Sequence, residues 1–118
     1  MCTAKGQIEL LDSELPPLPD NGILVQNDYT AVSVGTEIYG YIQGGEPGNK
    51  ASFPRPTGYC NTGVVLEVGA AVQNLVAGDR ICGQGHHAHL DILTQNYRKV
   101  PPGVSPKAAA FMVMGAIA

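Results

Sequence analysis

Glycine and proline are the residues that most constrain the fold of this chain. It has 15 glycines and 9 prolines among 118 residues, and they are spread along its length. Both residue types interrupt regular structure, so long helices do not fit between them. A chain of this length forms one domain with one core. The sequence therefore predicts a single domain of short strands joined by many turns.

Alternating and β-branched segments predict the strands. They are residues 6–15, 23–34, 63–72, a short strand that runs into Cys82, and one or two strands within residues 87–101. The strongest is 63–72, where Val64, Leu66 and Val68 share one face, with Val65 and Glu67 on the other. This pattern predicts a mainly β fold, a barrel rather than a sandwich, with short helical turns and a C-terminal helix.

Two further segments depart from the strand pattern. Residues 35–58 have few hydrophobic residues and many glycines, which predicts an irregular segment with one helical turn at residues 36–41. Such a segment inside a compact domain is usually functional or mobile. At the other end, Ser105 as N-cap and Pro106 in the first helical position predict a helix through residues 105–118. That helix has no stop signal before Ala118, so we expect more chain to follow it.

Charge and hydropathy exclude several classes of partner. The net charge is −3, and the seven lysines and arginines are scattered, so we expect no nucleic-acid partner. No apolar run approaches the roughly 20 residues of a membrane helix, so we expect no membrane partner. The N-terminus is charged and rich in proline, unlike a signal peptide, and we therefore expect a cytoplasmic protein.

The three cysteines indicate reduced, inert thiols. Cys2, Cys60 and Cys82 are odd in number and far apart, and no Cys-x-x-Cys pair occurs. This spacing argues against a disulfide framework and against a structural zinc lobe.

Five segments in a fixed order carry a family resemblance. They read SVGTE, TGYCNTGVVLEVG, VAGDRICG, GHHAHLDIL and KVPPGVSPKAAAF. In this order they resemble the N-terminal, GroES-like domain of the medium-chain dehydrogenase/reductase superfamily, which includes zinc alcohol dehydrogenases, sorbitol and threonine dehydrogenases and quinone reductases. The residues of these segments are most similar to those of a zinc-lacking branch that contains bacteriochlorophyllide 2-hydroxyethyl dehydrogenase.

The resemblance implies a GroES-like, partly open β-barrel over residues 1–118. In the family a Rossmann domain with a Gly-rich nucleotide fingerprint follows, and this chain has no Gly-x-Gly-x-x-Gly element. NAD or NADP is therefore expected only with that missing domain, and the chain alone is expected to be inactive. The implied function is the substrate-side half of an oxidoreductase for a small carbonyl or alcohol.

The resemblance also implies that no catalytic zinc is bound. The family's ligand positions correspond here to Val34, to Tyr59 and Cys60, and to Val113. Two of the four are valines, whereas a catalytic zinc needs about three protein donors. Some members use an arginine just after the first ligand position to hold the cofactor pyrophosphate. That position is Gly35, which weakens the hold on the cofactor from this side. Gly35 and Thr36 are the residues that the resemblance implies on the cofactor side.

A tyrosine then becomes the candidate for polarising the substrate carbonyl. The resemblance implies that Thr36 passes the alcohol proton toward solvent, and that Tyr59 or Tyr39 faces the cleft. Our hypothesis is that Tyr59, with Thr36, gives a hydrogen bond or proton to a carbonyl during hydride delivery. The alternative is that Tyr59 packs against its loop and Thr36 caps the short helical turn.

Other motifs have a functional and a structural interpretation. The tract of His86, His87 and His89 is typical either of a metal site or of a cleft wall. Cys60 is either a nucleophile with His87 as its base or a small residue at a tight turn. Arg55 and Arg80 either contact a cofactor phosphate or are solvated charges. For each, the structural interpretation is favoured.

A second hypothesis for the whole chain is a stand-alone, non-catalytic module. The apolar run of residues 108–118, if left uncovered, would drive self-association or binding of a partner. A homodimer is the form that this hypothesis predicts.

Overall fold

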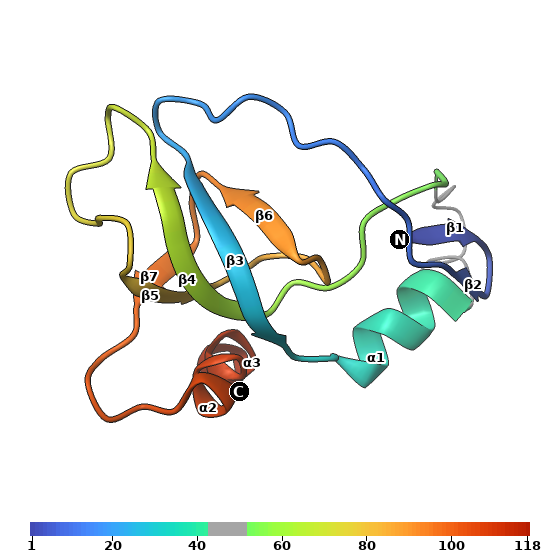
Figure 1. The fold of residues 1–118 in the computed structure, drawn as a ribbon. Coiled ribbons are helices and arrows are strands. Elements are labelled where there is room, and N and C mark those ends of the chain that lie inside the picture. The colour runs from blue at the N-terminus through green and yellow to red at the C-terminus, as the bar shows by residue number, and fades with distance from the viewer. Residues whose placement is uncertain (43–51) are drawn as a thin grey trace.

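The structure is a computed structural model that describes residues 1–42 and 52–118 (Figure 1). Its centre is a five-stranded antiparallel sheet in the order β6-β3-β4-β5-β7. The strands are β3 (Ile23–Thr30), β4 (Asn61–Val68), β5 (Arg80–Gly83), β6 (Leu90–Leu93) and β7 (Tyr97–Lys99). A separate hairpin joins β1 (Cys2–Ala4) to β2 (Gln7–Ile8). The predicted mainly β fold is confirmed.

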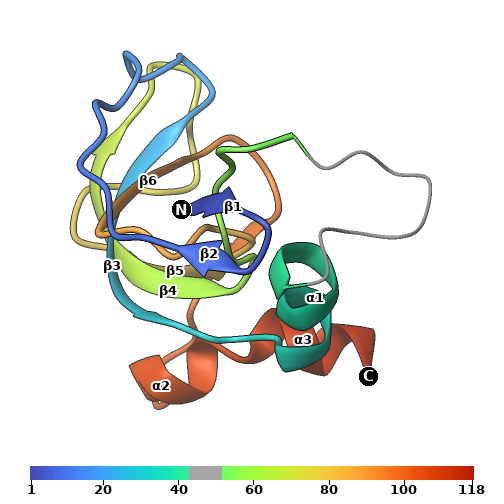
Figure 2. The same ribbon diagram turned by 90° about the vertical axis from the view of Figure 1, so that its right-hand side faces the viewer.

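Short helices gather at one side of this curved sheet. α1 (Val34–Glu37) continues into a π-helical turn, η1 (Ile38–Ile42), and follows the end of β3. α2 (Pro106–Ala109) contacts β3 and β4, and α3 (Met112–Ile117) contacts β5 (Figure 2). No helix in the described part of the chain is long and apolar enough to cross a membrane.

The main core lies on one face of the sheet. Its fully or nearly fully buried side chains are Ile23, Val25, Val65, Leu75, Ile81 and Leu93. Alternation along β3 explains part of this set, since Ile23 and Val25 point inward and Gln26 is exposed.

A β-bulge changes the predicted faces of β4. Leu24 pairs with Glu67 while Val25 pairs with Val65, so Leu66 is an extra residue in β4. As a result Val65 and Val68 both pack against the core, and Leu66 is exposed. The prediction that Val68 and Leu66 share a face opposite Val65 was therefore wrong.

The first predicted strand was also wrong. Gly6 has a positive φ of 70°, which turns the chain back between β1 and β2. The strands of this hairpin therefore end at Ile8, and residues 9–19 have no regular structure.

The predicted helical segments formed with different lengths. The turn expected at residues 36–41 extends over residues 34–42 as α1 and η1, so the strand expected to reach residue 34 ends at Thr30. The rest of the irregular prediction for residues 35–58 falls partly on 43–51, outside the described residues. Ser105 caps α2 as predicted, because its Oγ accepts a hydrogen bond from the Ala108 amide at 3.2 Å, and Pro106 follows it.

The C-terminal helix is split rather than continuous. Phe111 adopts φ −90° and ψ 0°, and its amide donates to the Ala108 carbonyl, which tightens the chain between α2 and α3. This bend keeps Ala109 and Ala110 buried, while Phe111 points outward.

Candidate functional site

The first part of the site is α1, which three residues separate from the end of β3. It carries Gly35 and Thr36, and Tyr39 follows in η1. Thr36 and Tyr39 are exposed, and no atom lies within 4 Å of a Cβ built on Gly35. The Ser33 hydroxyl donates to Thr36 Oγ1 at 3.2 Å, so the Thr36 hydroxyl is held at the first turn of the helix. These predicted residues therefore lie together on one solvent-facing helical segment.

The second part is the turn of residues 58–60, just before β4. Gly58 has a φ of +87°, a backbone conformation that favours glycine. Cys60 is fully buried and Tyr59 is partly buried. Burial raises the pKa of the Cys60 thiol, a hydrogen bond with the Met114 backbone opposes this, and the Glu37 charge adds to the rise. The thiol is therefore protonated at neutral pH, which argues against a Cys60 nucleophile.

Apolar packing surrounds this turn. One cluster, here named the Cys60 cluster, consists of Ala31, Cys60 and Ala110, with Tyr59, Val113 and Met114 packed against it. Tyr59 and Val113 of α3 thus pack against the same cluster, although 54 positions separate them in the sequence. No hydrogen bond joins the Tyr59 hydroxyl to Thr36 or Tyr39 within the described residues.

The third part is His87, which contacts both of the others. Its Nε2 lies 2.7 Å from Glu37 Oε1, and its Nδ1 lies 2.7 Å from Thr30 Oγ1. Its backbone amide donates to the Thr57 carbonyl at 2.7 Å, and its ring lies so close to Gly58 that a Cβ there would meet it at 2.8 Å. Both ring nitrogens are engaged, so neither is available as a base for Cys60.

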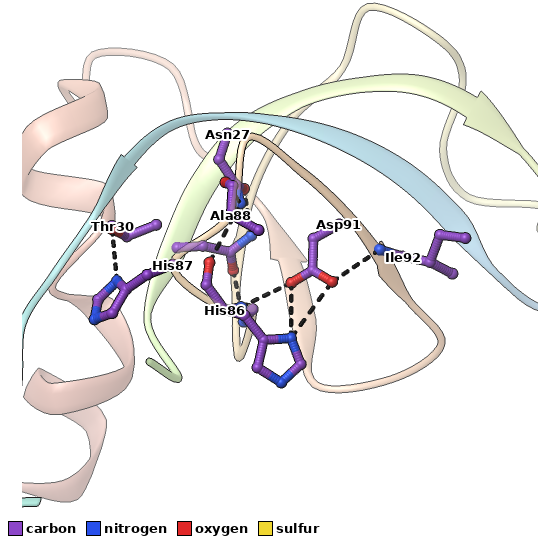
Figure 3. Close-up of polar contacts among 9 residues, drawn as sticks. Asn27, Thr30, His86, His87, Ala88, Asp91 and Ile92 are labelled. Atoms are coloured by element: carbon purple, nitrogen blue, oxygen red, sulfur yellow. Dashed lines mark hydrogen bonds and ion pairs between the residues drawn. The ribbon is translucent and has the colours of Figure 1, made fainter. Parts of the chain in front are cut away.

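The neighbouring His86 is held differently (Figure 3). Its Nδ1 lies 3.2 Å from Asp91 Oδ2, and its amide donates to the same oxygen at 2.7 Å. The hydrogen bond to Asp91 raises the pKa of His86 against the opposing effect of burial. Burial acts to raise the pKa of Asp91, but hydrogen bonds from His86 and the Ile92 amide hold it below its usual value.

Two asparagines fix the loop that carries these histidines. Asn61 is buried, accepts a hydrogen bond from the Gly85 amide at 2.9 Å and donates to Asn27 Oδ1 at 2.7 Å. Asn27 in turn donates to the Ala88 carbonyl at 2.9 Å. The loop is thereby tied to β3 and β4 on both sides of His87.

A groove of about 720 Å³ adjoins His87. The extended segment of residues 10–16 forms one wall, and Pro56, Thr57 and residues 86–91 form the other. Thr57 and His87 therefore connect this groove to the turn of residues 58–60.

Comparisons with known proteins place the chain. No family model matches it. It is 35% identical over 79 residues to L-threonine 3-dehydrogenase of Pseudoalteromonas atlantica, a match that covers 67% of this chain and 23% of that protein. Among solved structures, galactitol-1-phosphate dehydrogenase from Escherichia coli superposes with a TM-score of 0.78 at 14% identity, over 93% of this chain and 40% of that one. The Escherichia coli quinone oxidoreductase complexed with NADPH superposes with a TM-score of 0.67 at 24% identity, over 84% and 31%.

The chain is a GroES-like domain of the medium-chain dehydrogenase/reductase superfamily. The family resemblance of the five sequence segments is thereby confirmed. This GroES-like domain spans about a quarter of the length of the threonine dehydrogenase that it matches.

The GroES-like domain brings together three of the four positions that correspond to zinc ligands in the family. Tyr59, Cys60 and Val113 meet in the Cys60 cluster, and Val34 lies exposed at the start of α1. In residues 1–42 and 52–118, no group of three or more His, Cys, Asp or Glu side chains could hold a metal ion. The histidine tract forms no such group because His86 and His87 have different carboxylate partners.

The contacts of His87 with Glu37 and with Thr30 were not predicted from the sequence. Both Glu37 and His87 belong to segments that carried the family resemblance, but 50 positions separate them. No local pattern joins residues that far apart, so the only sequence signal was their presence in those segments. Arg80, once considered for a cofactor phosphate, forms an ion pair with Asp28, and Arg55 lies over the Phe53 ring.

Proposed function

We propose that this GroES-like domain is the substrate-side catalytic half of a zinc-independent, NAD(P)-dependent alcohol dehydrogenase or reductase for a small carbonyl or alcohol. The observation that carries the proposal is the Cys60 cluster, which puts apolar packing and a phenol at the family's metal-ligand positions. The similar chains include a threonine 3-dehydrogenase and an NADPH-bound quinone oxidoreductase, which supports dinucleotide-dependent oxidoreduction.

The donor set does not fit a catalytic zinc. Val34 and Val113 have no donor atom, and a neutral phenol such as that of Tyr59 is a poor zinc ligand. The Cys60 thiol is kept protonated by burial, so it too is a poor ligand. No step of the proposed reaction is therefore routed through a metal.

The chain's own part in the reaction is to bind and polarise the carbonyl oxygen. Tyr59 is partly buried and lies two residues before β4. We assign to its phenol the role of donating a hydrogen bond or a proton to that oxygen. Thr36, an exposed residue whose hydroxyl accepts a hydrogen bond from Ser33, would exchange the proton with water, and Tyr39 is the alternative phenol. Gly35 and Thr36 would face the cofactor. A bound NAD(P)H would supply the hydride.

The test begins with the gene. We would read it beyond the codon for Ala118, express the encoded protein, and measure oxidation of NADPH and NADH with a panel of aldehydes and ketones. We expect turnover that a zinc chelator does not reduce, and no turnover by the 118-residue chain without a nucleotide-binding domain. One tightly bound zinc per chain, with activity lost on chelation, would refute the zinc-independent mechanism.

The Tyr59→Phe variant tests the assigned phenol. It keeps the ring that packs in the Cys60 cluster and removes only the hydroxyl, so we expect turnover to fall by about 100-fold or more with little change in stability. Tyr29→Phe is the matched control, because Tyr29 is an exposed residue of β3 outside the cluster. Full activity in Tyr59→Phe would mean that Tyr59 serves only in packing. Tyr39 would then be the next candidate for the hydrogen bond to the carbonyl.

The exposed side chains of the C-terminal segment favour one alternative, a module that self-associates or binds a partner. Phe111 and Ile117 are 57% and 71% exposed, and Met112 is partly exposed beside them. An uncovered apolar group of this kind is typical of an interface.

A further inference from the structure

We infer that His87 is the positioning residue that holds α1 and the turn of residues 58–60 in register, a role that metal bonds fill in zinc-dependent members. This inference rests on the proposed function, because it explains how Thr36 and Tyr59 are kept in place without a metal. The His87 side chain contacts both segments.

The first step is the link from His87 to α1. His87 Nε2 lies 2.7 Å from Glu37 Oε1, and both side chains are largely shielded, with 21% and 15% of their surface exposed. Hydrogen bonds to a charged group are among the stronger ones, and partial shielding from water strengthens them further. Glu37 is adjacent to Thr36 in the same short helix, so this contact fixes the helix that carries the Thr36 hydroxyl.

The second step is the link from His87 to the turn. The His87 amide donates to the Thr57 carbonyl, and the imidazole ring covers Gly58, whose missing side chain leaves room for it. Tyr59 follows directly. The position of the imidazole therefore determines the path of the chain into Tyr59.

The third step is the orientation of the ring itself. Nδ1 shares a hydrogen bond with Thr30 Oγ1 at the end of β3 (Figure 3). Asn61 and Asn27 hold the loop on either side of His87, through the Gly85 amide and the Ala88 carbonyl. With both nitrogens engaged, the ring has one favoured orientation and no free nitrogen for a substrate. His87 is thus suited to positioning rather than to proton transfer.

Three of the family's metal-ligand positions lie on the same two segments that His87 joins. In zinc-dependent members the positions that correspond to Val34, and to Tyr59 and Cys60, bind one metal, which joins these two segments. Here the same segments are joined by Glu37, His87 and the backbone of Thr57, while the Cys60 cluster fills the space with apolar groups.

The test uses the 118-residue chain without cofactor or substrate. Hydrogen exchange would be followed at the Ile38 amide, which bonds to carbonyls of α1, and at the Ala31 amide, which bonds to the Cys60 carbonyl. In His87→Ala we expect exchange at both to rise by about tenfold or more, since a hydrogen bond to a charged group is lost. The Val65 amide in the core sheet should not change, and His89→Ala, an exposed residue of the same loop, is the matched control.

Two measurements distinguish loss of the specific His87–Glu37 contact from a general destabilisation of the domain. The double variant His87→Ala/Glu37→Ala should exchange no faster at Ile38 than His87→Ala alone, because both changes remove one interaction. In the wild-type chain, nitrogen-15 spectra should show a His87 ring N–H protected from solvent, and Glu37→Ala should abolish that protection without affecting His89. Unchanged exchange in His87→Ala, or additive effects in the double variant, would overturn the inference.

A kinetic readout distinguishes failure of this inference from failure of the proposed function. In the encoded enzyme, His87→Ala should lower kcat by about tenfold or more with the cofactor KM unchanged, as misplacement of catalytic groups predicts. An unchanged kcat, in an enzyme that Tyr59→Phe inactivates, would overturn the positioning role and leave the proposed function standing. If His87→Ala exchanges faster but the encoded protein shows no hydride transfer, the positioning role of His87 is supported and the proposed function is refuted.

Discussion

The site depends on Gly58 because this residue has no side chain. Its φ of +87° is costly for an L-residue, and a Cβ there would meet the His87 ring at 2.8 Å. We expect Gly58→Ala to lower the free energy of unfolding by about 2 kcal/mol or more, from backbone strain together with displacement of the imidazole. Urea unfolding of the chain measures it.

Gly78 provides the control for that experiment. It has a similar φ of +94°, but no atom lies within 4 Å of a Cβ built there. Gly78→Ala should therefore cost only the backbone strain, about 1 kcal/mol. If the two substitutions lower the free energy of unfolding equally, a Cβ at Gly58 does not displace the His87 ring.

The ion pair of His86 with Asp91 predicts a pH dependence. The pKa of His86 is raised, so its contribution is fully present below the ordinary histidine pKa of about 6.5 and is lost as the pH rises through the higher folded value. The pKa of Asp91 is lowered, so its contribution is present above about pH 3.9 and is lost as the pH falls through the lower folded value. The pair should stabilise the fold most between about pH 4 and 6.5.

Comparing unfolding at pH 5.5 and pH 8.5 tests this dependence. Because 46% of the His86 side chain is exposed, we expect His86→Ala to cost less than about 1 kcal/mol at the lower pH, and still less at the higher. His89→Ala should show no such difference. A cost that grows with pH would mean that the imidazole stabilises the loop in its neutral form.

At the scale of elements, α2 is short and depends on its cap. Ser105 Oγ accepts the Ala108 amide, and the helix that follows buries Ala109 beside the sheet. We expect Ser105→Ala to lower the free energy of unfolding by about 1 kcal/mol. Ser33 precedes α1 without a side-chain cap bond, so Ser33→Ala should cost less than about 0.5 kcal/mol. Equal costs in thermal unfolding would show that the Ser105 cap contributes nothing specific.

At the scale of the whole molecule, the exposed apolar side chains of Phe111 and of α3 predict self-association of the isolated chain. We expect sedimentation to show dimers at high concentration, and Phe111→Ser with Ile117→Ser to shift the chain toward monomer. Leu10→Ser is the control, because Leu10 is fully exposed but lies in the segment of residues 10–16. A wild-type chain that remains monomeric would exclude the self-association alternative.

Local patterns decided the parts of the fold that the sequence alone could predict. Frequent Gly and Pro, alternation in β3 and the Ser105–Pro106 cap depend on neighbouring residues, so the mainly β class and the start of α2 could be predicted without coordinates. The ordered segments that carried the family resemblance also identified Gly35, Thr36, Tyr39 and Tyr59 as candidates, whose catalytic roles stay predictions.

Packing between distant segments decided the rest. The bulge at Leu66 depends on how β4 fits against β3, and the bend at Phe111 depends on the contact of α2 and α3 with the sheet. The clearest case is His87, whose partners Glu37 and Thr30 lie 50 and 57 positions away. Only the folding of the loop across β3 and β4 brings these polar groups within hydrogen-bond distance, because a contact between remote residues is set by the path of the chain and not by local propensity.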